Sequence, residues 1–284
     1  MREIKSLGID VSEWQGEIDW EQVKTSGIGF AVIRCGYGKD LPGQDDAFFV
    51  RNAEECERLG IPYGVYLFSY ATDVEAAKSE AAHALRLLDG RKPRYPVFYD
   101  LEDGDTTGKQ SNGRILEIAK AFAEALETAG YTVGIYANYY WNTTKLTDSW
   151  YDTKPRWIAQ YNDINDYEGN YDIWQYSNTG TVPGVSGNCD MNRGYVDYGA
   201  SDGPGTGKEE FWVNVTLIRR GDTGSKVRAV QQLLIANGYP CGAYGDDGVF
   251  GPATENAVLL YQEDQGLASD AIVGPQTLGR LLGY

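Results

Sequence analysis

An alternation of short β-rich runs with longer helical patterns is the feature that most constrains this fold. The β-rich runs between residues 6 and 198 are SLGIDV, GFAVIRC, PYGVYLFSY, YPVFYDLE, TVGIYAN, RWIAQY and DIWQYS. Residues 45–60, 73–90 and 113–130 have spaced apolar residues and a glycine at the end, which is typical of helices. This repeated strand, helix, strand order predicts an α/β fold with a parallel sheet.

The number of β-rich runs favours a closed barrel over an open, doubly wound sheet. Residues 1–200 hold all of them, and the segments from RWIAQY onward leave little room for helices. We therefore predict that residues 1–200 form an irregular TIM-like (β/α) barrel whose last part lacks complete βα units.

The chain changes character after residue 197. The segment DYGASDGPGTGK is typical of a linker, which we place at residues 201–216. Residues 226–237, 252–265 and 275–282 have helical patterns, and DGVFGPAT at 247–254 is echoed by DAIVGPQT at 270–277. In each echo a turn precedes a proline at the first position of a helix. We predict a small all-α three-helix domain over residues 217–284.

Composition argues against several classes of function. A formal net charge of -16 and an isoelectric point near 4.5 disfavour nucleic acid and anionic membranes as partners, because both attract clustered Lys and Arg. No apolar run is long enough to span a membrane. The single histidine, His83, lies among alanines on a helical pattern, so we expect a packing or surface role. With no His-based triad, P-loop or dinucleotide motif, we expect neither a metal ion nor a cofactor.

The cysteines are far apart in the sequence. Cys35, Cys56, Cys189 and Cys241 form no C-x-x-C pair, so we interpret them as small buried hydrophobic residues. One disulfide within the first part is the alternative.

A pair of carboxylates ends one apolar β run. Asp100 and Glu102 in YPVFYDLED are two residues apart, so on an extended segment their side chains point to the same face. The D-x-E spacing also occurs at Asp19, Asp73 and Asp166, but only the pair at Asp100 ends an apolar β run. Barrel active sites lie where strands end, and glycosidic cleavage commonly needs two carboxyl groups that flank the bond. The alternative is a solvated strand end.

Two further acids are candidates for the same site. Asp10 ends the first β run, where a third carboxylate would raise the pKa of a neighbouring general acid. Asp190 in GNCDMNRG follows the last β-like segment. The structural alternatives are a turn cap for Asp10 and a turn residue for Asp190.

Aromatic residues are concentrated near the predicted strand ends. Phe, Trp and Tyr make up 13% of the chain, and aromatic faces stack on the apolar faces of sugar rings. We expect substrate contacts from residues at or beside the predicted strand ends, although many aromatic residues must belong to the core. The expected contacts are Tyr66, Phe68, Tyr136, Trp157, Gln160, Tyr161 and Trp174.

Several segments, in order, resemble the family-25 glycoside hydrolases, the Chalaropsis-type lysozymes. They are GIDVSEWQGEIDW, the YPVFYDLE strand end, WIAQY and WQYSNTGTVPGVSGNCDMN, and together they cover about the first 200 residues. Members often carry Trp or another large residue at Tyr99, a departure that bears on subsite detail. The segment from RRGDTGSKVRAVQQLL to VGPQTLGRLL resembles the three-helix peptidoglycan-binding domain of wall hydrolases.

The resemblance implies an N-acetylmuramidase that cleaves the β-1,4 bond between N-acetylmuramic acid and N-acetylglucosamine in bacterial peptidoglycan. The catalytic positions carried over are Asp10, Asp100, Glu102 and Asp190, with Glu102 as general acid. Asp100 is implied to act as nucleophile or to orient the acetamido group of the substrate. Because a carboxyl pair about 5 to 5.5 Å apart marks nucleophilic retaining enzymes, and substrate assistance also retains, we expect retention of configuration.

Two other functions stay open at this point: a degenerate barrel that binds glycan without cutting it, and an enzyme for chitin-like polymers. We expect action outside the cell, on the bacterial wall. The start MREIKSLGID lacks the apolar run of a signal peptide, so either an export signal has been removed or the protein leaves its cell by another route. This favours a phage endolysin modestly over a bacterial autolysin.

Overall fold

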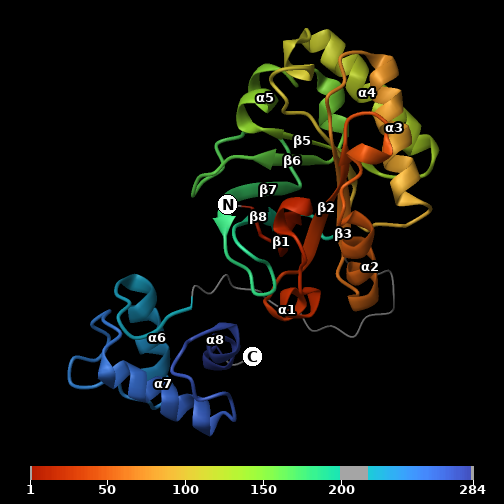
Figure 1. Ribbon diagram of the computed structural model, residues 1–284. Helices are drawn as coiled ribbons and strands as arrows, with labels where there is room; N and C mark the ends of the chain where they lie inside the picture. Colours follow the sequence, from red (N-terminus) through yellow and green to blue (C-terminus); the bar gives the residue numbers. More distant parts are fainter. Residues whose placement is uncertain (1, 199–216, 283–284) are drawn as a thin grey trace. The chain divides into compact units, whose positions relative to one another are not determined.

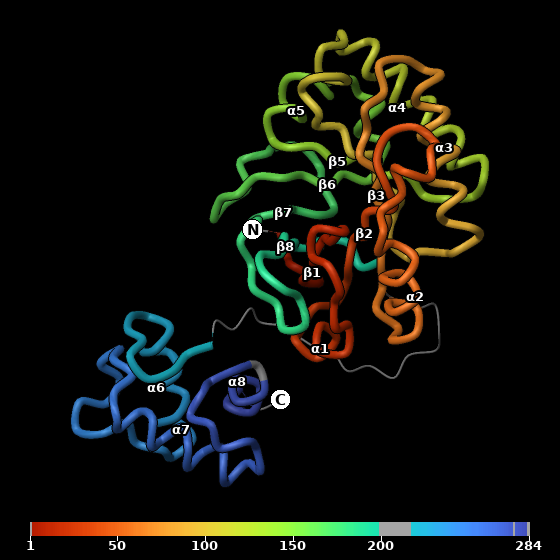
Figure 2. The backbone as a smooth tube through the Cα atoms, in the orientation of Figure 1, coloured from red at the N-terminus to blue at the C-terminus, as the bar shows by residue number. Residues whose placement is uncertain are grey.

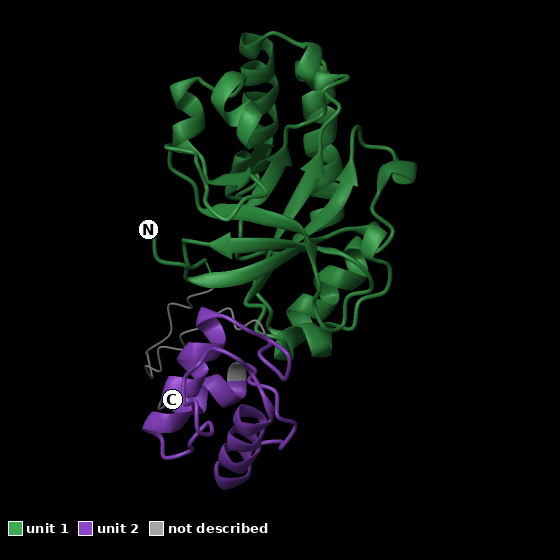
Figure 3. Ribbon diagram, turned by 90° about the vertical axis from the view of Figure 1, so that its left-hand side faces the viewer, with its two compact units in different colours: residues 1–205 green, residues 206–284 purple. Residues whose placement is uncertain are grey.

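The computed structural model describes residues 2–198 and 217–282 and divides the chain into two compact units, residues 1–205 and 206–284 (Figure 3). The linker predicted at residues 201–216 lies outside the described residues. Within the described ranges, no helix is both long and apolar enough to cross a bilayer.

Unit 1 is a closed barrel of strands, as the sequence predicts (Figure 1). Each strand from β1 to β6 runs parallel to the next, and β8 pairs antiparallel with both β7 and β1. No helix separates β6, β7 and β8, which confirms the irregular last part (Figure 2). The described strands are β1 (Ser6–Val11), β2 (Phe30–Tyr37), β3 (Tyr63–Phe68), β4 (Val97–Asp100), β5 (Val133–Asn138), β6 (Arg156–Ala159), β7 (Ile173–Gly180) and β8 (Cys189–Gly194).

Strand β8 is a correction to the sequence analysis, which ended the β runs at residue 177. Its sequence, CDMNRG, places apolar Cys189 and Met191 on the outer side and polar Asp190 and Asn192 on the inner side. A strand that turns polar residues inward lacks the usual apolar-in pattern, so its alternation was not recognised.

Helices cover the outer face of the barrel, where α3 packs against α4 (Figure 1). The three long helices confirm the predicted ones, whereas α1 and α5, at six residues each, are too short to show a helical period. The helices of unit 1 are α1 (Trp20–Thr25), α2 (Phe49–Leu59), α3 (Val74–Leu88), α4 (Asn112–Thr128) and α5 (Tyr139–Thr144).

Alternation along each strand separates two apolar regions. Residues such as Ile33, Leu67 and Tyr99 face outward and pack under the helices. Phe98 and Trp157 face inward and fill the barrel. Because successive side chains point to opposite faces, this register fixes which strand-end residues reach the inside.

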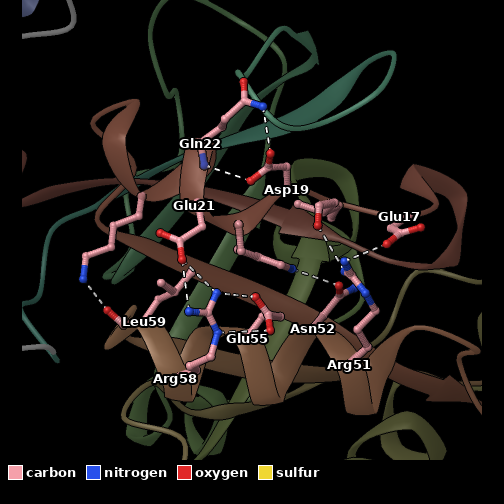
Figure 4. Close-up of polar contacts among 12 residues, drawn as sticks. Glu17, Asp19, Glu21, Gln22, Arg51, Asn52, Glu55, Arg58 and Leu59 are labelled. Atoms are coloured by element: carbon pink, nitrogen blue, oxygen red, sulfur yellow. Dashed lines mark hydrogen bonds and ion pairs between the residues drawn. The ribbon is translucent and has the colours of Figure 1, made fainter.

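Polar contacts tie the segment after β1 to α2 (Figure 4). Arg58 pairs with Glu21 at 3.0 Å and with Glu55 at 2.8 Å on the surface, where such pairs contribute little. Underneath, the Trp20 indole N–H donates to Asn52 Oδ1 at 3.0 Å, and both side chains are buried. This buried bond contributes more, and it anchors the chain that leads away from Asp10.

All four cysteines are buried free thiols, as their spacing predicted, and the alternative disulfide is not formed. His83 is also buried: its ring contacts the Gly38 carbonyl at 3.0 Å and Asp45 at 2.9 Å. It therefore has the packing role that the sequence indicated.

The described part of unit 2 contains α6 (Ser225–Ala236), α7 (Pro252–Asp264) and α8 (Pro275–Leu281) around a small apolar core. The echoed motifs have the same local structure. Gln231 Nε2 donates to Asp247, the Val249 carbonyl and Thr254, at 2.9, 3.1 and 3.0 Å. Gln262 Nε2 makes the equivalent bonds to Asp270, the Ile272 carbonyl and Thr277, at 2.8, 3.1 and 3.0 Å. Each turn is thus held by a buried glutamine on the preceding helix.

We predict that Gln231→Leu lowers the free energy of unfolding of unit 2 by about 1–3 kcal/mol, because it removes a hydrogen-bond partner of the buried Thr254 hydroxyl and of the buried Gly248 amide. Hydrogen exchange of the α6 amides in the full chain measures this change. Gln232→Leu is the matched control, since Gln232 is the next residue along the chain and its side chain is exposed. Equal protection in the two variants would contradict the prediction.

Candidate active site

One cavity of about 230 Å³ opens where the barrel strands end, and all four predicted carboxyl residues line it. Asp10 lies near the end of β1, Asp100 is the last residue of β4, and Glu102 follows two residues later. Asp100 and Glu102 therefore reach the same cavity, as alternation along an extended segment predicts. Asp190 lies within β8 and not in a turn after the last strand.

Barrel closure sets Asp190 opposite Asp10. The two residues are cross-strand partners in the antiparallel pairing of β1 with β8, and their side chains are hydrogen-bonded to each other. Burial and the charge of Asp190 raise the pKa of Asp10, whereas hydrogen bonds from Asn192 and Gln175 lower it. Burial also raises the pKa of Asp190, while the hydrogen bond to Asp10 lowers it. The pair therefore favours one shared proton and one charge.

Asp100 is 3% exposed, and its Oδ1 has no hydrogen-bond partner among the described residues. Burial, Glu102 and Asp10 raise its pKa, and Arg34 opposes this rise. Arg34 is itself engaged, because its guanidinium donates to Asp46 at 2.8 Å and to Glu13 at 2.7 Å. The orphaned oxygen is therefore available to a donor on a substrate.

Glu102 has the environment of a carboxyl that holds its proton. Burial raises its pKa, a side-chain hydrogen bond from Asn138 lowers it, and the charge of Asp190 raises it again. Asn138 ends β5, and its side chain also caps α5 by accepting from the Trp141 amide at 3.0 Å. The acid is thus held near a fixed helix start at the cavity wall.

Most of the expected aromatic contacts lie in this cavity. Tyr66, Phe68, Tyr136, Trp157 and Tyr161 line it. Two expected contacts, Trp174 and Gln160, do not line the cavity. Trp174 follows inward-facing Ile173, so alternation turns its ring away from the cavity, where Arg193 packs over it. The Gln160 side chain turns back to Asp166 at 2.9 Å.

Tyr99, which departs from the resembled pattern, also lies away from the cavity. Its ring stacks on Phe122 of α4 at 3.9 Å between centroids, and its hydroxyl donates to Glu80 of α3. Glu80 is fully buried and also accepts from the Ser69 hydroxyl and the Tyr70 amide, at 2.8 and 2.9 Å. The departure therefore concerns helix packing and the loop after β3, and not a subsite as expected.

Sequence reasoning missed several residues that line the cavity, chiefly Trp14, Arg34 and Gln175. Trp14 is 81% exposed on a turn in which the Ser12 amide donates to Gln15 Oε1 at 2.9 Å. The S-x-x-Q pattern of this capping box was a readable signal. Gln175 is a polar residue at an inward position of an otherwise apolar strand start, which was a signal too.

Two carboxyl groups that enter one aromatic-lined cavity at the strand ends are what acid-assisted glycoside cleavage requires. The fold and the site therefore define a barrel glycosidase.

Comparison with known proteins gives the particular family. Glycosyl hydrolases family 25 matches residues 9–185, and a putative peptidoglycan binding domain matches residues 223–281. The autolytic lysozyme of Clostridium acetobutylicum is 28% identical over 279 residues, covering 96% of this chain and 77% of its own. This chain belongs to glycosyl hydrolase family 25 and carries a C-terminal peptidoglycan-binding domain.

Solved structures of an autolysin and a lysozyme also match this chain. The modular autolysin LytC from Streptococcus pneumoniae matches with a TM-score of 0.60 and 28% identity, over 66% of this chain and 46% of LytC. This chain thus spans less than half of LytC. A bacterial lysozyme from Streptomyces coelicolor matches with a TM-score of 0.58 and 26% identity, over 66% of this chain and 91% of its own.

We predict that Asp100→Asn stabilises unit 1 at neutral pH by about 1–3 kcal/mol, because it removes a buried, unpartnered carboxyl. Since the pKa of Asp100 is raised above its ordinary 3.8, the wild type loses stability as pH rises from that value through the raised pKa. The gain should therefore vanish near pH 4.

Urea unfolding at pH 4 and pH 8 measures this difference. Asp105→Asn is the control, since that side chain is 92% exposed. A gain of the same size at both pH values would contradict the assignment of a raised pKa.

Proposed function

We propose that this protein is a lysozyme, an N-acetylmuramidase that hydrolyses the β-1,4 bond between N-acetylmuramic acid and N-acetylglucosamine in bacterial peptidoglycan. The observation that carries the proposal is the entry of Asp100 and Glu102 into one cavity with Asp100 Oδ1 unpartnered. Relatives described as autolytic lysozyme and Lysozyme M1 support the same substrate, and so does the C-terminal domain.

Glu102 is the general acid in this mechanism. Its raised pKa keeps it protonated, so it donates its proton to the glycosidic oxygen as the bond from C1 to that oxygen breaks. The departing sugar leaves as an alcohol. Glu102, now a carboxylate, then takes a proton from the water that attacks C1.

Asp100 supports the positive charge that develops at C1. An acetamido N–H of the substrate would supply the hydrogen bond that Oδ1 lacks, and would turn the acetamido oxygen towards C1. The alternative is direct attack by the Asp100 carboxylate. Both routes invert C1 twice and so retain configuration.

The rim of the cavity holds the sugar chain. Trp14 is exposed on the loop after β1, and Tyr161 is half-exposed after β6. Both present an apolar ring face on which a sugar can stack. We propose that the protein reaches the bacterial wall by secretion or, if it is a phage endolysin, by release from the host cytoplasm. The names autolysin and endolysin among the matched proteins support these two routes.

We predict that Glu102→Gln folds normally and loses wall lysis by about 10²–10⁴-fold, the usual contribution of general acid catalysis. Turbidity clearance of purified cell walls measures the rate, and mass spectrometry of the fragments shows which sugar carries the new reducing end. Retained clearance would overturn the assignment of Glu102, and fragments ending in N-acetylglucosamine would overturn the proposed bond.

We also predict that the first product is the β anomer at the new reducing end, because both proposed routes retain configuration. A proton NMR time course of a soluble peptidoglycan fragment distinguishes the anomers before they equilibrate. Early α product would show inversion instead.

A further inference from the structure

Gln175 is a buried amide at the centre of a closed hydrogen-bond network beside the carboxyl cluster. Its side chain comes from β7 and is 2% exposed. Oε1 accepts from the hydroxyls of Tyr136 at 2.9 Å and Tyr161 at 3.1 Å. Nε2 donates to Asp10 Oδ2 at 2.8 Å and to Asp190 Oδ2 at 3.4 Å.

The tyrosines and the aspartates together fix the direction of this amide. Both hydroxyls donate to Oε1, so the two N–H groups are directed at the two aspartates. A reversed amide would place its oxygen against a carboxylate oxygen, which repels it when that carboxylate is ionised. A buried network in which every member is satisfied resists such a change.

We propose that Gln175 is a positioning residue that keeps the Asp10–Asp190 pair negatively charged, and that this charge adds to burial in keeping Glu102 protonated. The inference rests on the proposed function, in which Glu102 is the general acid. Gln175 itself transfers no proton; it acts through the aspartates.

The surroundings of the pair explain why an amide donor is needed. Several charged and titratable groups share the cavity with the Asp10–Asp190 pair. They are Arg34 from β2, Tyr66 from β3, Asp100 at the end of β4, Glu102 after β4, Tyr136 from β5 and Tyr161 after β6. On the outer side of β8, burial raises the pKa of the Cys189 thiol, which stays neutral. The carboxyls oppose a charge on the pair, and the one cation among these groups already donates to Asp46 and Glu13.

The amides of Gln175 and Asn192 are therefore what favours ionisation. Both lower the pKa of Asp10. The resulting charge reaches Glu102, because Asp190 raises the pKa of that carboxyl. Loss of the Gln175 amide should raise the pKa of the pair and lower that of Glu102.

The test is Gln175→Met, which keeps the length of the side chain and removes both polar ends. The profile of kcat/KM against pH should become narrower. The acidic limb, which follows the pKa of the pair, should move to higher pH, and the alkaline limb, which follows the pKa of Glu102, should move to lower pH, each by about half a pH unit or more. The control is Gln22→Met, whose exposed side chain bonds to Asp19 outside the cavity. It should leave both limbs in place.

A readout without activity separates this inference from the proposed function. Carboxyl ¹³C NMR of the full chain labelled at glutamate, assigned with Glu102→Gln, follows the titration of Glu102 directly. In Gln175→Met it should titrate at lower pH than in the wild type. If the wild type is active and Gln175→Met leaves both limbs and the Glu102 titration unchanged, the inference is overturned. An inactive wild type overturns the proposed function alone.

A second variant covers the case in which Gln175→Met does not fold. The double variant Tyr136→Phe, Tyr161→Phe keeps the amide but removes the hydroxyls that fix its direction. It should shift the Glu102 titration in the same direction and by less. An unshifted titration in this folded variant also overturns the inference.

Discussion

The closure of the barrel by β8 is the constraint on which the site depends. Without it, β7 and β1 would each present an edge of unpaired backbone groups, and β8 satisfies both by pairing antiparallel with each. The same pairing sets Asp190 across from Asp10 and brings Asn192 within 2.7 Å of the Asp10 carboxylate. One strand thus completes both the fold and the carboxyl cluster.

The electrostatics of the cavity follow from that closure. Four carboxyls line the cavity, and burial is the first cause of the raised pKa of each of these four groups. Burial of this kind opposes folding at neutral pH, so the cluster trades stability for a protonated acid beside a charged pair. Amide donors, which carry no charge, moderate the cluster without cancelling it.

In both units, polar side chains hold turns and loops in place. In unit 2 one arrangement, a buried glutamine that holds the following turn, occurs twice and explains the echoed motifs. In unit 1 polar side chains likewise fix loops, as buried Glu80 does for the loop after β3 and half-buried Gln15 does for the loop that carries Trp14.

The sequence by itself determined the barrel, its irregular end, the three long helices and the shared direction of Asp100 and Glu102, because these depend on local period and alternation. It did not determine β8, whose inward residues are polar, or the short helices α1 and α5. Only the tertiary structure decided that Asp190 faces Asp10, that Gln175 bridges them, and that Trp174 turns away. Those facts depend on which strand pairs with which and in what register, and no local pattern records that pairing.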